Sequence, residues 1–306
     1  MLPVTYYLTH IGATLGSLLQ RVHFLFSDDV SYLKLLYWLK TGRKLNMDNP
    51  QRFNEKMQWL KLYNHQPEYT DMVDKYKAKQ LVENLMGKQY IIPTLGVWNS
   101  PQDICWESLP QQFVLKTNHG GGGVGVVVCK DKTLLKKKKV LCQLTKSMRI
   151  SGADGLKEWP YKNVQRRILA EQYVEDVDNQ QLVDYKFHCF NGVPKLVLVC
   201  RDRYGNTGAS KDFYDMEWNH LPISRELNGN AKGDFEKPAE FTRMIRMAEE
   251  LSRGIPFVRI DLYLANHQIY FGEYTFFPAS GLSKFCPDEW DFILGEWLEL
   301  PQTKTI

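Results

Sequence analysis

The sequence has no apolar run long enough to cross a membrane, since a spanning helix needs roughly 18 or more apolar residues in a row. Its start does not read as a secretory signal either, because Thr9, His10, Thr14 and Ser17 interrupt the apolar stretch and no Lys or Arg precedes it. We therefore expect a cytoplasmic protein. Residues 6–39 are rich in Leu, Tyr and Phe, so peripheral association with a membrane or partner is one interpretation; packing on the protein's own core is the one we favour.

Metal-binding and disulfide patterns are also missing. None of the six cysteines falls in a CxxC pair, and the seven histidines form no HExxH motif. This pattern favours reduced thiols and argues against a zinc site. A net charge of +4 is too weakly basic to indicate a nucleic-acid-binding protein, although it suits an anionic substrate such as a nucleotide or an acidic sugar polymer.

The 306 residues, 43% of them hydrophobic, suffice for two or three small lobes around a shared site. The hydrophobic pattern predicts helices over 31–40, 53–63, 70–86, 132–148, 237–252 and 287–298, and strands over 90–98, 112–116, 126–129, 168–174, 182–190, 195–201, 257–264 and 268–274. Residues 202–235 read as an irregular polar loop. Helices followed by hairpins indicate an α+β fold and not a doubly wound sheet.

An acidic pair lies near the end of the chain. Arg259 and Asp261 are two apart on a predicted strand and so point to the same face, and the next strand brings Glu273 opposite them. Two facing carboxylates need a cation between them, and Mg²⁺ with nucleotide phosphates would fit. Arg259 would then stabilise the charge on a transferred phosphoryl group. The alternative is a surface ion pair in a β-hairpin.

A glycine-rich loop, NHGGGGVG, spans residues 118–125 between two predicted strands. Backbone amides without side chains can approach a phosphate closely. No GK[ST] follows and no helix opens there, so the loop is neither a Walker A motif nor a dinucleotide fingerprint. A flexible hairpin tip is the alternative. Lys116 and Lys186, both on predicted strands, are phosphate contacts or edge-strand lysines.

In this order the motifs resemble the ATP-grasp superfamily, whose members hold ATP between two α+β lobes beneath a glycine-rich hairpin lid. Residues 259–261, 271–275 and 278–281 look like the metal-binding strand pair of D-alanine–D-alanine ligases. The resemblance implies that Asp261 and Glu273 bind Mg²⁺ and that Arg259 contacts the transferred phosphate. Thr275 stands where the family usually has Asn, and its hydroxyl can still ligate the metal.

The same resemblance implies which residues bind ATP. They are Lys116 and Lys186 as phosphate lysines, Gly120, Gly121, Gly122 and Gly123 as the lid, Glu171, Gln172 and Val174 as the adenine-binding hinge, and Asp178 as the ribose-binding acid. Arg259 and Lys186 are the implied catalytic residues. Asp74 and Lys75 resemble a further phosphate contact of the first lobe.

A closer resemblance, to the TupA-like (teichuronopeptide biosynthesis) ATP-grasp proteins, rests on residues 49–63, 109–116, 184–192 and 271–281. It implies an N-terminal helical segment, a first-lobe region, a lid subdomain and a C-terminal catalytic lobe. Their expected ranges are 1–65, 66–110, 111–175 and 176–306.

The function implied by these resemblances is an ATP-dependent carboxylate–amine ligase that uses ATP and Mg²⁺. It would join the amine of an amino acid to the carboxylate of a uronic acid in a surface polysaccharide through an acyl phosphate. The opposite polarity, with an amino-acid carboxylate and an amino sugar, stays open. Two alternatives stay open: a kinase sharing the same site, and a glycosyltransferase or assembly partner whose Asp261 and Glu273 bind a metal with a nucleotide sugar.

Overall fold

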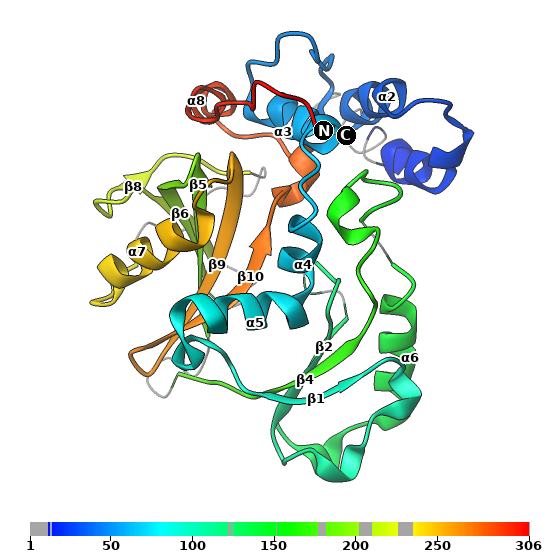
Figure 1. The fold of residues 1–306 in the computed structure, drawn as a ribbon, viewed down its shortest axis with the longest axis vertical. Helices are drawn as coiled ribbons and strands as arrows, with labels where there is room; N and C mark the ends of the chain where they lie inside the picture. Colours follow the sequence, from blue (N-terminus) through cyan, green and yellow to red (C-terminus); the bar gives the residue numbers. More distant parts are fainter. Residues whose placement is uncertain are drawn as a thin grey trace, which may run out of the picture.

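The computed structural model describes residues 12, 14–121, 123, 125–150, 152–176, 182–201, 210–225 and 235–305. These residues form two antiparallel sheets, each with a hydrophobic core of its own. Helices α2 (Asp29–Thr41), α3 (Phe53–Tyr63) and α8 (Glu289–Trp297) lie at one end of the molecule, the smaller sheet lies at the other end, and the larger sheet lies to one side (Figure 1).

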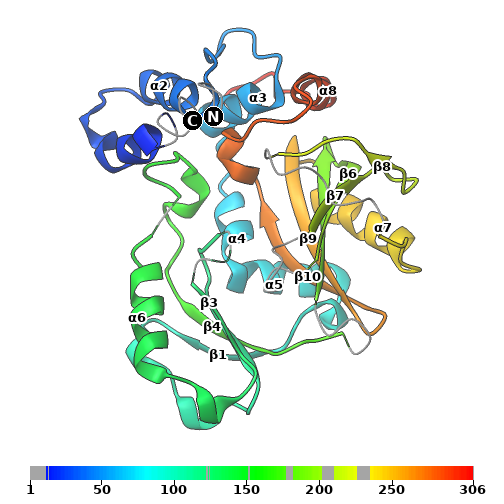
Figure 2. The same cartoon turned by 180° about the vertical axis from the view of Figure 1, so that it is seen from behind.

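The smaller sheet has the order β1-β4-β2-β3. Its strands are β1 (Thr94–Trp98), β4 (Ile168–Gln172), β2 (Phe113–Thr117) and β3 (Val126–Cys129). Helix α6 (Lys137–Ser147) covers one face, where Val140 and Leu144 join the core formed by Phe113, Leu115 and Ile168 (Figure 2). Successive side chains of a strand point to opposite faces of the sheet, so the face away from α6 receives the polar side chains of these strands.

The larger sheet has the order β10-β9-β5-β6-β7-β8. Its strands are β5 (Val183–Phe190), β6 (Val193–Arg201), β7 (Ser210–Tyr214), β8 (His220–Leu221), β9 (Phe257–Ala265) and β10 (Gln268–Thr275). Helix α7 (Phe241–Ser252) packs on one face, where Phe187 stacks against Phe241 at a ring distance of 5.8 Å. Every residue of β5 is buried, so its polar residues on the other face are buried as well.

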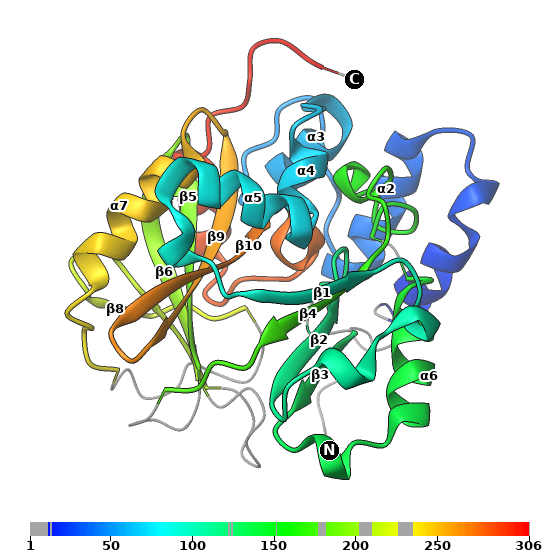
Figure 3. The ribbon, with the colours of Figure 1, turned by 60° about the horizontal axis from the view of Figure 1, so that its bottom comes forward.

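Helices α4 and α5 link the two sheets. The helices outside the sheets are α2 (Asp29–Thr41), α3 (Phe53–Tyr63), α4 (Tyr69–Val73), α5 (Lys75–Met86) and α8 (Glu289–Trp297), with 3₁₀ turns at Gln20–Leu25, Lys88–Tyr90, Pro101–Asp103, Trp106–Ser108, Lys132–Leu134, Trp159–Tyr161 and Pro278–Gly281. Ala78 and Val82 of α5 belong to the core of the larger sheet, while its Lys79 contacts Glu171 of the smaller sheet. Helix α5 therefore lies between the sheets (Figure 3).

Three predicted elements differ from the structure by more than their end points. The helix expected over 70–86 breaks at Asp74, whose extended backbone lets its side chain accept a hydrogen bond from the Tyr76 N–H at 2.9 Å and cap α5. The helix expected over 132–148 is a 3₁₀ turn followed by α6, since Lys136 is not helical. The polar loop expected over 202–235 contains β7 and β8, which extend the sheet where apolar residues such as Phe213 find a core position.

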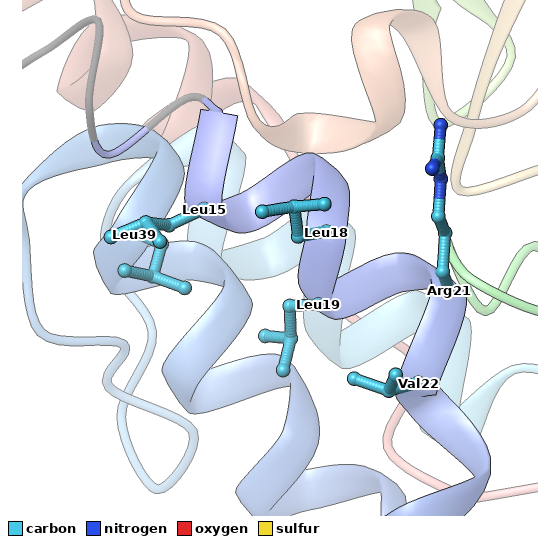
Figure 4. A pocket seen from close by; sticks show the side chains of 6 residues that line it. All are labelled: Leu15, Leu18, Leu19, Arg21, Val22 and Leu39. Atoms are coloured by element: carbon cyan, nitrogen blue, oxygen red, sulfur yellow. The ribbon is translucent and has the colours of Figure 1, made fainter.

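No helix among the described residues is both long and apolar enough to span a membrane. An apolar pocket of about 430 Å³ lies in the N-terminal helical segment, apart from the strands that carry the acidic pair (Figure 4). It is lined by Leu15, Leu18, Leu19, Arg21, Val22 and Leu39.

Helix α8 approaches the start of α3 closely enough that only glycine fits at position 295. A Cβ on Gly295 would lie 2.0 Å from the Gln51 carbonyl oxygen and 2.9 Å from the Phe53 nitrogen. We expect Gly295→Ala to lower the free energy of unfolding by about 1–3 kcal/mol, the usual cost of overpacking, in urea denaturation. Gly121→Ala is the control, since a Cβ there meets no atom within 4 Å. Equal stability of the two variants would contradict this close contact.

Candidate active site

Asp261 and Glu273 face each other across neighbouring strands. The register of β9 and β10 pairs Glu273 with Asp261 and Thr275 with Arg259. Residues 268–271 pair in a register that would put Gly272 opposite Asp261, but a bulge at Gly272 moves Glu273 into that place. A Cβ on Gly272 would lie 2.9 Å from the Asp261 carbonyl oxygen, so glycine permits the bulge.

Arg259 connects all three predicted metal ligands. Its Nε and Nη2 donate to the two carboxylate oxygens of Asp261 at 2.6 and 2.7 Å, and Nη2 also donates to Thr275 Oγ1 at 3.1 Å. Glu273 Oε1 lies 3.6 Å from the same nitrogen. Burial alone would lower the pKa of Arg259, but Asp261 and Glu273 outweigh it and raise that pKa. The guanidinium therefore stays charged at the acidic pair.

Lys186 approaches the same carboxylate from the third strand. It lies opposite Asp261 in the pairing of β5 with β9, and its Nζ forms an ion pair with that carboxylate. A second carboxylate, Asp184, lies 3.3 Å from Nζ. Asp184 was not among the predicted site residues, although its position two residues before Lys186 on a strand places both on one face.

Lys75 joins the glycine-rich loop to the acidic pair. Its Nζ lies 2.9 Å from Glu273 Oε2 and donates to the Gly120 carbonyl oxygen at 2.5 Å. Its backbone N–H donates to the Asn118 carbonyl at 3.0 Å, and Asn118 Nδ2 donates to Asp74 Oδ1 at 2.8 Å. The first residues of α5 thus hold the start of the loop beside β10.

The cations around Glu273 set its charge. Burial acts to raise the pKa of Glu273, but Lys75, Lys186 and Arg259 outweigh it and hold the pKa well below the usual range. Glu273 is therefore an anionic oxygen donor at neutral pH.

A second ion cluster lies on the smaller sheet. Glu171 Oε2 is 2.6 Å from Lys116 Nζ, and Oε1 is 2.5 Å from Lys79 Nζ. Lys79 also donates to the Ile92 carbonyl at 2.7 Å. Lys79 was not among the predicted site residues, but its spacing of four from Lys75 puts both on one face of α5. Glu171, which was predicted to belong to the adenine-binding hinge, therefore forms ion pairs with two lysines. One of them, Lys116, is a predicted phosphate lysine.

The other predicted ATP residues lie around these clusters. Gln172 ends β4 and its N–H donates to the Pro93 carbonyl at 3.0 Å, while Val174 follows it half-buried. In the glycine-rich loop, a Cβ added at Gly121 or Gly123 would meet no described atom within 4 Å, so there is open space beside both. The predictions for Gly122 and Asp178 concern positions outside the described residues.

The donor set fits Mg²⁺ that arrives with a nucleotide. Asp261 and Glu273 offer carboxylate oxygens and Thr275 a hydroxyl, which are donors that Mg²⁺ prefers. Within the described ranges no three His, Cys, Asp or Glu side chains form a metal-binding group. Mg²⁺ commonly takes one or two carboxylates and completes its shell with phosphates and water, so two carboxylates suffice.

Comparison with known protein families shows to which family this chain belongs. The model of the TupA-like ATP-grasp family matches residues 55–299. The chain belongs to this family. That membership, with two antiparallel sheets and their helices, confirms the predicted α+β ATP-grasp fold. No curated protein matches the sequence.

Solved structures of ligases are distantly similar to the TupA-like chain. The D-alanine–D-alanine ligase from Bacillus anthracis has 14% identity and a TM-score of 0.41, over 67% of this chain and 56% of that one. The enzyme from Helicobacter pylori has 13% identity and a TM-score of 0.41, over 81% and 70%. D-cycloserine synthetase DcsG has 14% identity and a TM-score of 0.42, over 76% and 70%. Similarity at this level does not identify substrates.

Glu171 provides a test of the second cluster. Glu171→Gln leaves buried Lys79 and half-buried Lys116 without a counter-charge, so we expect it to lower the free energy of unfolding at pH 7 by about 3–5 kcal/mol in urea. Burial alone would raise the pKa of Glu171, but Lys116 and Lys79 lower it. The stabilisation that the Glu171 carboxylate provides is therefore complete above the pKa of Glu in the unfolded chain, about 4.3. It is lost as the pH falls from there through the lowered pKa of the folded protein.

The control is Glu175→Gln, which removes the exposed partner of Lys130 and should leave the urea midpoint unchanged. If the loss caused by Glu171→Gln were the same at pH 3 and pH 7, an ionic origin would be ruled out.

Proposed function

We propose that this protein is an ATP-dependent carboxylate–amine ligase that activates a carboxylate as an acyl phosphate. The observation that carries the proposal is Lys75, which contacts both Gly120 of the glycine-rich loop and Glu273 of the acidic pair. The parts expected to bind phosphate and metal therefore meet at one side chain. Membership of the TupA-like ATP-grasp family supports the same reading.

The roles of the chain's residues follow from their charges and positions. Asp261, Glu273 and Thr275 would hold Mg²⁺, which when bound neutralises phosphate oxygens and orients them. Lys75 and Lys186 would exchange their present carboxylate partners for phosphate oxygens. Lys116, paired with Glu171, faces the nucleotide from the smaller sheet, and the loop amides of Gly120, Gly121 and Gly123 close over the phosphates.

Arg259 would stabilise the transferred phosphoryl group. A carboxylate oxygen of the substrate attacks the γ-phosphorus, the bond to the bridging oxygen breaks, and ADP leaves. The buried, permanently charged guanidinium offsets charge on the phosphoryl oxygens. An amine then attacks the acyl carbon, phosphate departs with the C–O electron pair, and the amine loses a proton to give the amide. Positioning and charge, without a covalent enzyme intermediate, account for this chemistry.

The proposed substrates are an amino acid as amine and a uronic acid of a surface polysaccharide as carboxylate. The likeness to TupA-like proteins supports this pair, and a net charge of +4 suits an acidic glycan. A cytoplasmic location, where ATP is available, belongs to the proposal. Peripheral membrane contact stays a prediction; the exposed Phe24 and Leu25 in the N-terminal segment are compatible with it.

Nucleotide binding should depend on Glu273. Its side chain is 24% exposed, so Glu273→Gln should fold, whereas Asp261 is deeply buried between Lys186 and Arg259. We expect Glu273→Gln to weaken ATP binding in the presence of Mg²⁺ by about tenfold or more, or about 1.4 kcal/mol, in isothermal titration calorimetry. Without Mg²⁺ the two proteins should differ much less.

Glu289→Gln, which alters an exposed glutamate of α8, is the matched control and should bind as the wild type does. UDP-sugars that bind as tightly as ATP would favour the glycosyltransferase alternative instead.

Labelled oxygen separates a ligase from a kinase. With an ¹⁸O-carboxylate uronate fragment, an amino acid and ATP, an acyl-phosphate ligase releases inorganic phosphate that carries one ¹⁸O atom from the carboxylate. We expect this transfer, measured by mass spectrometry of the phosphate, for the wild type and not for Arg259→Met. A kinase would retain the phosphoryl group in a stable ester and release none. Screening amino acids against acidic glycan fragments by ADP release would select the pair to label.

A further inference from the structure

Arg225 is a second buried guanidinium near the acidic pair, and its position is fixed by backbone contacts. Its Nη1 donates to the Pro278 carbonyl oxygen at 2.9 Å, and its own carbonyl accepts from Ser283 Oγ at 2.9 Å. The preceding residue, Ser224, pairs with Cys286 through two backbone hydrogen bonds of 2.9 Å. Pro278 follows Thr275, the residue that Arg259 contacts, by three positions. Arg225 therefore lies just beyond the end of β10.

The guanidinium of Arg225 has unused donors. Within the part of the chain that the structure describes, its Nε and Nη2 are buried and donate to no protein atom. Across the ranges that the structure describes, no carboxylate lies within 4.0 Å of it, and the rings of Phe285 and Phe53 lie 4.7 and 5.9 Å from its Cζ. Burial, and then the charge of Arg259, lower the pKa of Arg225 to about 9. A buried cation without a counter-ion is unfavourable, so its retention needs a reason.

The charge of Arg225 also reaches the face that carries the catalytic groups. His188 lies on β5 opposite Arg259. Burial, followed by the charges of Arg225 and Arg259, holds the pKa of His188 well below its usual value. The imidazole is therefore neutral, and Arg259 is a like charge that disfavours the protonated form of Arg225, while the carboxylate of Asp291 offsets this only in part.

The turn that Arg225 contacts is strained. Ala279 and Ser280 are not glycines, yet both have left-handed backbone conformations, with φ of 50° and 56°. Lys61 and Gln58 of α3 hold this turn: Lys61 Nζ donates to the Ser280 carbonyl at 2.8 Å and Gln58 Nε2 to the Gly281 carbonyl at 2.9 Å. Strain maintained by buried hydrogen bonds is typical of ligand-binding segments.

We propose that Arg225, at the turn of residues 278–281, binds the free carboxylate of the amino-acid substrate. This rests on the proposed ligase function, in which the amino acid reacts through its amine and keeps its carboxylate in the product. Nε and Nη2 of an arginine lie side by side and can donate to both oxygens of one carboxylate. Anchored there, the amino acid would present its amine toward Arg259, where the acyl phosphate forms.

The first test needs neither a known substrate nor turnover. Sodium acetate, replacing sodium chloride at constant ionic strength, should raise the melting temperature of the wild type, whereas acetamide, its neutral counterpart, should not. Arg225→Gln should lose the acetate effect and Arg225→Lys should keep part of it. Arg246→Gln, an exposed arginine of α7, is the control and should respond fully. An acetate effect undiminished in Arg225→Gln, or none in the wild type, would overturn the proposal.

The second test uses the active pair from the ADP-release screen. Arg225→Gln should raise the KM for the amino acid at least tenfold and leave the KM for ATP unchanged. The wild type should prefer the amino acid over its carboxamide, and the variant should lose that preference by a similar factor. A preference that survives in Arg225→Gln would refute the assignment. If no pair is active but acetate binding depends on Arg225, the ligase proposal fails and the anion site stands.

Discussion

The arrangement of the candidate active site depends on one constraint, the contact of Lys75 with both Gly120 and Glu273. It spans two sheets with separate hydrophobic cores, so apolar packing alone does not fix their relative position at this point. The break of the helix at Asp74 makes the contact possible, because the Asp74 side chain caps α5 and also accepts from Asn118. One aspartate therefore begins the helix and fastens the start of the loop whose Gly120 carbonyl accepts from Lys75.

The charges on the inner face of the larger sheet balance one another. Asp184, Asp261 and Glu273 supply three carboxylates, and Lys75, Lys186 and Arg259 supply three cations among them. Removing such groups from water is costly unless each is paired, and the cross-strand register provides the pairing. A nucleotide with Mg²⁺ brings charges of both signs, so on its arrival the lysines can exchange carboxylates for phosphate oxygens and the carboxylates can exchange lysines for the metal. This property suits a site that repeatedly binds and releases ATP.

The alternation of apolar residues predicted most strands, because one face of each strand is apolar. Phe187 and Ile260, which pair on the face covered by α7, are examples. Arg259, Asp261 and Glu273 were assigned to neighbouring strands on the same grounds. The exact partner of Glu273 was not predictable, since a bulge at Gly272 shifts the register by one residue. Lys79 and Arg225 were missed because their roles depend on long-range contacts, with Glu171 and Pro278, that no local pattern encodes. The strands β7 and β8 were missed because their segment is short of apolar alternation.

Arg259 and Arg225 differ in how many of their hydrogen-bond donors already have partners in the protein. Nε and Nη2 of Arg259 already donate to Asp261 and Thr275, so its charge is held in place at the acidic pair. Arg225 has one bond to a carbonyl and two donors left over, so it gains most from an incoming anion. Arg259 on β9 pairs with Thr275 at the end of β10, and Arg225 contacts the turn that follows β10. In the proposed function, Asp261 of β9 with Glu273 and Thr275 of β10 would hold the metal, and the amine substrate would bind just beyond the end of β10.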